Sequence, residues 1–558
     1  MSGGAETELN DPAADRRRRL RHLAPAALIF VAAMTVLMAT DNLYGFTYDE
    51  PIYTAKSGAV VEWLSLLSLR PADALSPRAL AIYWHGKDQH PGCYKLLTAL
   101  CASTIGRLGS PASQFRAGTN LLCALCLAAV YLFIAGLWGR AAGAYGVGAL
   151  LCMPRVFAHC HLTALDAPIM ATSFITVIAV WQACVVKDDG SARASRRAWL
   201  WAVAAGALWG MALGTKLNSV VIPLIVLPWV FVFARRRLWR LLVSFAVVGP
   251  LVFFITWPWL WDDTWSRLGA YIMFHWQHWQ ISVMYFGRVY TVAPWHYPLV
   301  MTAITLPPVT LVLALVGGMR VAQVWRVQRS PGQADARAAA MALVLLGLVV
   351  NLVPNCLPST PKYGGVRLFL PIFPYIAVLA AVGLRAVLDW VVVDKLRGHG
   401  DKGRLGKQVT ALVVALALAG PIKALGRFVP YHLSYYNCFI GGLPGATRAG
   451  MEPTYWGESY RYAASWLIPN ARPGSTVWVE PQGYESTFRL FELGQRRPDL
   501  LFSTGLEGFE TADYAVTQNK ATEFTIITHR LVAEHRPVYS DGIDGVPIIY
   551  VFDLKQGP

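Results

Sequence analysis

The sequence predicts an all-α polytopic membrane protein that ends in a small α/β domain. Of its 558 residues, 55% are hydrophobic and only 15% are charged, and the mean hydropathy is +0.41. Soluble domains carry about 25% charged residues, so this composition is typical of a chain that lies largely in lipid. The apolar residues form about eleven runs, and the composition changes near residue 427. These observations predict a bundle of membrane-spanning helices followed by a domain outside the membrane.

The first apolar run, 23–40, directly follows a basic cluster at 16–21 and is interpreted as a retained membrane anchor. Ten further apolar runs fall at 117–138, 143–160, 167–186, 199–215, 217–234, 241–260, 296–319, 339–354, 368–388 and 408–426. Some are shorter than the roughly 20 residues that a span needs. The stretch 91–106 has roughly 16 residues, which suits an interfacial or re-entrant helix better than a full span.

The basic residues predict how the chain is oriented. The formal net charge of +16 comes from short clusters between apolar runs, which argues against a nucleic-acid partner. Placing the N-terminus inside puts every strongly basic loop on the cytoplasmic side, as the positive-inside rule requires. These loops are Arg140, 187–197, 235–240, 320–337 and 395–407. This assignment of loops to the two sides requires that 91–106 does not cross the membrane. We therefore expect a multi-pass protein of the cell inner (plasma) membrane with a cytoplasmic N-terminus and an extracytoplasmic C-terminus.

Three regions follow from this topology. Residues 1–22 form a cytoplasmic basic N-terminus, 23–426 form the transmembrane domain with a large first outer loop at 44–116, and 427–558 form the extracytoplasmic domain. In the last region, STVWVEP, ADYAVTQ and VPIIYVFDL are typical of short strands. YESTFRLFELGQRR and ATEFTIITHRLVAEHR are typical of helices. The pattern predicts a small α/β domain on the outer face.

A pair of acids, Asp49 and Glu50, follows the first span in the segment FTYDEPIYTAKSG. Because the basic cluster stays inside, the first span delivers both carboxylates to the outer face. Carboxylates held at a membrane surface are candidates for function. The alternative is that they cap or solvate a short helix. Placement alone leaves both interpretations open.

Asp166 is the second acidic candidate, at the outer mouth of two adjacent predicted spans. At the start of an inward-running helix it can instead act as an N-terminal cap. His159 and His161 precede it, and residues at i and i+2 do not share a helix face. A zinc site from these two histidines alone is therefore a weak prediction, although His161 beside an acid could help hold a divalent cation.

Lys216 and Arg367 fall at outer ends of predicted spans, against the positive-inside trend. Snorkelling toward lipid headgroups explains such residues in most proteins. The alternative is that they neutralise a phosphate at the membrane surface, since guanidinium binds phosphate bidentately and ammonium binds it as a point charge. His90 and Lys362 are further candidates for phosphate binding on the same side.

The order of these segments resembles the GT-C superfamily of membrane glycosyltransferases that use polyprenyl-phosphate sugars. Within that superfamily it is most similar to the protein O-mannosyltransferase and aminoarabinose transferase branch. The matching pieces are FTYDEPIYTAKSG, QHPGCYKLLTAL, LTALDAPIMATSFITV, GTKLNSVVIPLIVLP, VRLFLPIFPYIAVLAA and the segment from VPYHLSYYNCFIGGLPGA to YWGESYRYAASWL. The resemblance extends to about residue 470.

This resemblance implies that Asp49 is the catalytic acid, with Glu50 beside it and Asp166 as the second acidic position. It also places Lys216 and Arg367 near the lipid-linked phosphate. In such a reaction a carboxylate takes the proton of the acceptor hydroxyl, and cations stabilise the leaving phosphate. Direct displacement inverts the anomeric centre. No cofactor is required if the cations suffice, and a divalent metal remains possible.

The expected function is therefore transfer of a sugar from a polyprenyl-phosphate donor to an acceptor hydroxyl outside the membrane. The expected partners are that donor, an extracytoplasmic protein, lipid or glycan acceptor, and the bilayer. The main alternative is a polytopic transporter or flippase of a lipid-linked or small polar substrate. The chain shows no obvious half-repeats and few ionisable residues in mid-span, which disfavours that alternative.

Overall fold

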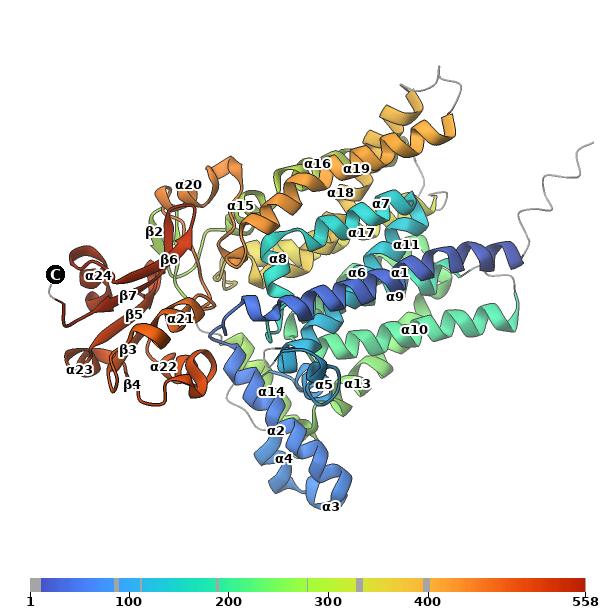
Figure 1. The fold of residues 1–558 in the computed structure, drawn as a ribbon. Coiled ribbons are helices and arrows are strands. Elements are labelled where there is room, and N and C mark those ends of the chain that lie inside the picture. Colours follow the sequence, from blue (N-terminus) through green and yellow to red (C-terminus); the bar gives the residue numbers. More distant parts are fainter. Residues whose placement is uncertain are drawn as a thin grey trace, which may run out of the picture.

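The chain forms a long helical bundle with a mixed β-sheet at one end. The structure is a computed structural model, and it describes residues 12–84, 90–110, 113–186, 190–277, 280–327, 335–394 and 402–556. Figure 1 shows the C-terminal sheet at one end of the bundle, whereas helix α1 (Pro12–Thr40) begins at the opposite end. The predicted fold class, a helical membrane domain with a small C-terminal α/β part, is confirmed.

Seven helices of the described residues are long and apolar enough to cross a bilayer, so the protein is embedded in the membrane as a multi-pass protein. They are Arg21–Leu43, Ser113–Trp138, Asp166–Val185, Arg235–Ile255, Ala336–Cys356, Arg367–Val391 and Leu405–Arg427. Each coincides with one of the predicted spans. They comprise α1, α6 (Ser113–Trp138), α9 (Asp166–Val185), α12 (Leu238–Val243) with α13 (Gly249–Ile255), α17 (Ala336–Cys356), α18 (Phe373–Leu388) and α19 (Lys402–Arg427).

The other four predicted spans are also helical but shorter, interrupted or less apolar. The interruptions occur at prolines, because proline cannot continue a helix and favours its first turn. They are α7 (Arg140–Leu151) with α8 (Pro154–His159), α10 (Ala192–Leu213), α11 (Ile222–Phe233), and α15 (Tyr297–Thr305) with α16 (Pro308–Val327). The number of membrane crossings, about eleven, therefore stays a prediction.

Helix α5 (Cys93–Ser103) occupies the segment for which the sequence predicted no crossing. With 11 residues at about 1.5 Å per residue it is roughly half as long as the hydrocarbon core is thick. The length agrees with the predicted interfacial or re-entrant helix.

The bundle has a centre and a lipid-facing rim. In the span Arg367–Val391, 89% of the most apolar stretch is buried inside the protein, whereas in Leu405–Arg427 the buried share is 11%. Central packing is close where α16 meets α18, because a Cβ on Gly317 would meet the backbone of Leu379 and one on Gly383 would meet that of Leu313. Small residues allow this approach of two helices.

Several basic loops meet at the end of the bundle where α1 begins. Arg140 Nη2 donates to the backbone oxygen of Arg21 (2.9 Å), and Arg337 Nε donates to that of Leu137 (2.8 Å). These contacts join three loops that the sequence placed on one face. Which face of the membrane this is stays a prediction.

At the other end, four helices lie outside the predicted spans. They are α2 (Glu50–Leu69), α3 (Pro71–Ala74), α4 (Pro77–Trp84) and α14 (Thr264–Trp276). The aromatic segment after α14 contains a small hairpin of β1 (Val283–Tyr285) and β2 (Arg288–Tyr290), which the sequence analysis did not predict.

The C-terminal sheet has the strand order β4-β3-β5-β7-β6. The three predicted strands are present as β3 (Thr476–Glu480), β5 (Tyr514–Gln518) and β7 (Val546–Asp553), and the helices include α21 (Tyr460–Asn470), α22 (Glu485–Thr487), α23 (Gly505–Glu510) and α24 (Ile526–Glu534). Strand β3 pairs in parallel with β4 and β5, whereas β7 pairs antiparallel with β5 and β6.

The two edge strands, β4 (Leu501–Ser503) and β6 (Tyr539–Ile543), were not predicted. One is too short and the other too polar to show a strand pattern. The packing changes later than the composition does. Residues from Phe428 to Trp456, including α20 (Gly442–Arg448), pack into the core of the bundle, and the core of the sheet begins at Tyr460.

Candidate active site

Asp49 lies at the junction between the loop that leaves α1 and the first turn of α2. Its side chain makes no capping hydrogen bond to that helix, so the capping interpretation does not describe it. Instead Oδ2 accepts a hydrogen bond from Arg367 Nη2 (2.7 Å) and one from Trp456 Nε1 (3.2 Å). The side chain is 31% exposed. A carboxylate fixed at one oxygen and open to solvent can receive a proton at the other.

Asp166 begins α9 and is almost fully buried between two cations. Lys216 Nζ lies 2.6 Å from Oδ1, and Arg367 Nε lies 3.1 Å from Oδ2. Arg367 therefore joins both acids, and the four side chains form one continuous chain from Lys216 to Asp49. The structure thus brings together four residues that the sequence analysis selected separately.

This ionic cluster is balanced in charge, but its donors are not used up. The two carboxylates cancel the charges of Lys216 and Arg367. Among the described residues, Lys216 Nζ makes one hydrogen bond, to Asp166, for its three N–H donors, and Arg367 has five N–H donors. Remaining donors of both residues can therefore bind a further anion beside the acids.

Backbone geometry brings Arg367 into place. Gly364 has φ +62°, and a Cβ there would lie 2.6 Å from Arg367 Cδ, so glycine is needed both for the conformation and for the space. On the other side, the guanidinium lies 4.1 Å from the ring centre of Trp456. Such stacking orients a guanidinium while leaving its edge free for hydrogen bonds.

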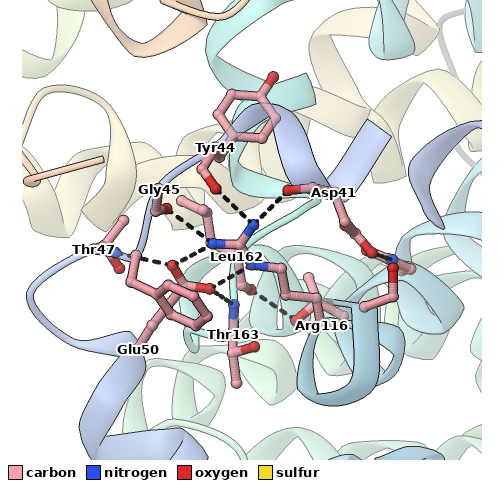
Figure 2. A network of polar contacts seen from close by, with 12 residues as sticks. Asp41, Tyr44, Gly45, Thr47, Glu50, Arg116, Leu162 and Thr163 are labelled. Atoms are coloured by element: carbon pink, nitrogen blue, oxygen red, sulfur yellow. Dashed lines mark hydrogen bonds and ion pairs between the residues drawn. The ribbon is translucent and has the colours of Figure 1, made fainter. Parts of the chain in front are cut away.

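Glu50 points away from this cluster, and its carboxylate is saturated with hydrogen bonds (Figure 2). Arg116 binds it bidentately, with Nε to Oε1 and Nη2 to Oε2 at 2.9 Å each. The backbone N–H groups of Thr47 (2.9 Å) and Thr163 (2.8 Å) donate to it as well. Because this carboxylate is fully buried and accepts from four donors, its geometry favours a structural role, and the predicted catalytic role of Glu50 stays a prediction.

Arg116 uses its other donors to shape the loop before Asp49. Nη1 donates to the backbone oxygens of Asp41 (2.6 Å) and Tyr44 (3.1 Å), and Nη2 donates to that of Gly45 (2.9 Å) (Figure 2). The buried pair of Glu50 and Arg116 therefore holds the segment that carries Asp49.

Two of the remaining predicted residues are occupied elsewhere. Lys362 Nζ donates to the backbone oxygens of Leu357 (2.7 Å) and Thr360 (2.9 Å), so it closes a turn rather than facing the acids. His161 bonds Thr40 Oγ1 through Nε2 and the backbone oxygen of Phe157 through Nδ1, both at 2.7 Å. With both ring nitrogens engaged, His161 is not available as a metal ligand, and the described part of the chain contains no group of three His, Cys, Asp or Glu residues placed to hold a metal ion.

His90 stays close to the cluster but uncharged. Lys95 Nζ donates to its backbone oxygen (2.8 Å), and its ring packs near Tyr53 and His275. Burial first, and then the charges of Lys216 and Lys95, hold the pKa of His90 well below its ordinary value. A neutral imidazole beside Lys216 can donate or accept a hydrogen bond but adds no positive charge.

The sequence analysis missed Trp456, which touches both Asp49 and Arg367. It lies in the segment YWGESY, and the resemblance of this segment to GT-C glycosyltransferases was the available signal. The following Gly457 has φ +95°, and a Cβ there would lie 2.5 Å from the ring of Tyr48. Glycine therefore lets the Trp456 segment reach the loop that carries Asp49, where Tyr48 N–H donates to the backbone oxygen of Trp456 (3.0 Å).

The C-terminal domain contacts the same loop. The hydroxyl of Tyr48 bonds Gln518 Oε1 (2.9 Å) and Glu523 Oε2 (2.8 Å). Phe46 N–H donates to Glu492 Oε1, and the hydroxyl of Tyr484 donates to the backbone oxygen of Phe46. The segment before Asp49 is thus held from the sheet as well as from the bundle.

The fold and the ionic cluster together define a membrane-embedded protein with an acid–base centre at the end of its bundle near the C-terminal sheet. A family model described as dolichyl-phosphate-mannose-protein mannosyltransferase matches residues 89–261. This match begins after α4 and includes Asp166 and Lys216. No curated protein matches the chain in sequence.

Solved structures of similar fold cover nearly the whole chain. ArnT from Cupriavidus metallidurans is 16% identical, with 96% of this chain and 98% of that chain covered at a TM-score of 0.50. The oligosaccharyltransferase from Archaeoglobus fulgidus is 12% identical, with 90% and 69% covered at a TM-score of 0.50. At these identities the likeness concerns the fold. The predicted resemblance to the GT-C glycosyltransferases is therefore confirmed for the fold and, over residues 89–261, by the family model.

Proposed function

We propose that this chain is an inverting glycosyltransferase that moves a hexose or pentose from a polyprenyl-phosphate donor to an acceptor hydroxyl on the outer face of the membrane. The family model supports the donor class, because its description names a dolichyl-phosphate sugar. The fold supports the reaction class. The observation that carries the proposal is the half-exposed Asp49, held at Oδ2 beside two cations that retain free donors.

In this reaction Asp49 acts as the general base. Its free Oδ1 takes the proton of the acceptor hydroxyl while that oxygen forms a bond to the anomeric carbon. The bond between this carbon and the phosphate oxygen breaks on the opposite side, and its electron pair leaves with the polyprenyl phosphate. Arg367 and Lys216 stabilise the charge that develops there. Asp166 keeps both cations in position.

The position of the site suits a lipid-linked donor. The phosphate of such a donor lies at the bilayer surface, and Asp166 and Arg367 begin spans of the bundle. The site belongs to the outer face, with the N-terminus in the cytoplasm and the C-terminal domain outside the inner membrane. A protein, lipid or glycan acceptor reaches Asp49 from that side. The remaining donors of Lys216 and Arg367 suffice in this proposal to stabilise the leaving phosphate without a metal, and a divalent metal is the alternative.

The test is transfer of labelled sugar from polyprenyl-phosphate donors in proteoliposomes. Wild type is compared with Lys216→Met, and with Lys407→Met, a control in the lipid-facing helix α19. We expect Lys216→Met to reduce turnover roughly 10- to 100-fold, the loss of one charge-assisted contact to the leaving group. Chelation with EDTA should leave wild-type turnover unchanged.

Three results would count against parts of this proposal. Loss of turnover with EDTA and recovery with one divalent ion would replace the metal-free reaction. Equal turnover of Lys216→Met and wild type would remove Lys216 from the site. Movement of the intact labelled lipid across the membrane without release of sugar from its phosphate would establish the transporter alternative instead.

A further inference from the structure

A second arginine, Arg155, lies buried beside the ionic cluster and lacks partners for most of its donors. It belongs to α8 and is 2% exposed. Nε donates to the backbone oxygen of Tyr435 (3.1 Å), whereas Nη1 and Nη2 have no hydrogen-bond partner among the described residues. A buried donor without a partner costs about 1–3 kcal/mol, and more when charged. Native proteins rarely retain such atoms unless a ligand or water satisfies them.

Aromatic rings and a glycine surround this guanidinium. Its carbon lies 4.6 Å from the ring centre of Tyr436 and 5.4 Å from that of Tyr455. A Cβ on Gly365, which has φ +63°, would lie 2.6 Å from Nη1. Glycine at residue 365 therefore lets the backbone approach the unpaired donors closely, where any side chain would clash with Nη1 and with the ring of Tyr455.

The residues around Arg155 show that it lies beside Arg367 of the ionic cluster. Gly365 faces Arg155, whereas the preceding Gly364 faces Arg367. In the same way Tyr455 stacks on Arg155, whereas the following Trp456 stacks on Arg367. In each of these two pairs of consecutive residues, one residue contacts Arg155 and the other contacts Arg367. The two guanidiniums therefore lie side by side.

An unpaired acceptor accompanies the unpaired donors. Glu458 is 2% exposed, its Oε1 accepts a bond from Thr454 Oγ1 (3.1 Å), and its Oε2 has no partner among the described residues. Burial raises the pKa of Glu458 to about 7, and the charge of Arg155 is among the factors that lower it. Glu458 follows Tyr455, whose ring contacts Arg155, by three residues, so the unpaired acceptor lies on the segment that covers the unpaired donors.

We propose that Arg155 and Glu458 form the subsite for the hydroxyl groups of the transferred sugar. A sugar hydroxyl accepts one hydrogen bond and donates another, so neighbouring hydroxyls satisfy a guanidinium and a carboxylate oxygen together. This inference rests on the proposed function.

Burial assigns this region to the sugar rather than to the acceptor. Asp49 is the half-exposed member of the cluster, so an acceptor arrives at its open side. Arg155 and Glu458 are closed from solvent, and Arg155 adjoins Arg367, the proposed site of the donor phosphate. Only one oxygen separates the phosphorus of the donor from the anomeric carbon, so a phosphate on Arg367 brings the attached ring to its neighbours.

The test compares bare polyprenyl phosphate with three lipids that carry different sugars on the same phosphate. Binding of polyprenyl phosphate and of polyprenyl-phosphate mannose, glucose and arabinose is measured in nanodiscs for wild type, Arg155→Gln, Glu458→Gln and the exposed control Arg530→Gln. We expect both site variants to weaken binding of the preferred sugar lipid roughly tenfold or more. Binding of bare polyprenyl phosphate should change less than about twofold.

The outcomes separate this inference from the proposed function. If wild type binds neither kind of lipid, the proposed function fails. If wild type binds bare polyprenyl phosphate and no sugar lipid better, or if the variants bind every lipid as wild type does, only the sugar subsite is overturned. Equal weakening for bare and sugar lipids would assign Arg155 to the phosphate. If Arg155→Gln does not fold, the isosteric Glu458→Gln decides the question.

Discussion

Asp49 and Glu50 are consecutive acids, and each is paired with an arginine from a distant part of the chain, yet they do different things. Glu50 is completely buried, whereas the side chain of Asp49 is 31% exposed. Glu50 accepts from Arg116 at both oxygens and from two backbone N–H groups, whereas Asp49 is bound at Oδ2. An acid becomes available for chemistry when an oxygen remains open to solvent, and it becomes structural when every lone pair is used.

The largest expected effect separates the two acids by rate. Asp49→Asn keeps the shape of the side chain and removes the base, so turnover with a polyprenyl-phosphate sugar should fall about 10²- to 10⁴-fold. The melting temperature in detergent should remain near that of wild type, because the residue is half exposed. Turnover within about threefold of wild type would remove Asp49 as the base.

The second prediction concerns stability. Glu50→Gln leaves the guanidinium of Arg116 buried without its counter-charge, which should lower the free energy of unfolding by about 3–5 kcal/mol. Thermal unfolding in detergent measures it. The double variant with Arg116→Gln should recover part of this loss, since it removes the isolated charge. A stable Glu50→Gln protein with abolished turnover would instead return Glu50 to the catalytic group.

A smaller effect is expected where Asp49 receives its second hydrogen bond. Trp456→Phe keeps a ring over Arg367 but removes the indole N–H that reaches Asp49 Oδ2. Losing one such bond should reduce turnover about fivefold, measured under saturating donor. Trp265→Phe, an exposed tryptophan of α14, is the matched control. If both tryptophan variants behave alike, the contact does not position Asp49.

The smallest expected effect is a pH dependence of stability. Burial, as the largest cause, raises the pKa of Glu492 from 4.5 to about 7. Between these values the folded protein binds more protons than the unfolded one, so this residue makes stability fall as pH rises through that window and level off above it. Glu492→Gln should remove part of this slope in melting temperature.

Two other buried carboxyl groups, Glu452 and Glu458, serve as the internal control for the pH experiment. Glu452 and Glu458 have pKa values raised in the same direction by burial, so wild type should retain a residual slope in the Glu492→Gln variant. A variant with the same slope as wild type would mean that Glu492 stays ionised beside Phe46.

Much of the site could be predicted because its charges break the rules of membrane sequences. Asp166, Lys216 and Arg367 stand at the ends of spans on the side predicted to be outer, where apolar composition disfavours charge and the positive-inside rule disfavours the two cations. Their contacts could not be predicted, since Asp49 and Arg367 are separated by 318 residues. Spacing in the sequence carries no information about pairs so far apart.

The contacts of Arg116, Trp456 and Tyr455 could not be predicted, because residues of these types are common in several environments of a membrane protein. Arg116 begins an apolar helix and has the appearance of an ordinary flanking cation, so its pairing with Glu50 was not foreseen. Trp456 and Tyr455 lie in an aromatic-rich segment of a kind typical of membrane interfaces. The fold class followed from composition and periodicity, whereas short or polar strands such as β4 and β6 gave no periodic signal.

The contacts of Tyr48 with Gln518 and Glu523 have a consequence for synthesis of the protein. The ribosome makes Asp49 near the start of translation, but the residues that hold the preceding loop leave the exit tunnel only near the end. A nascent chain that has inserted its spans therefore has the contacts of this loop with Arg116 but still lacks those with the sheet. If the proposed function is right, a chain that ends before Gln518 is expected to have lower turnover than the full-length protein.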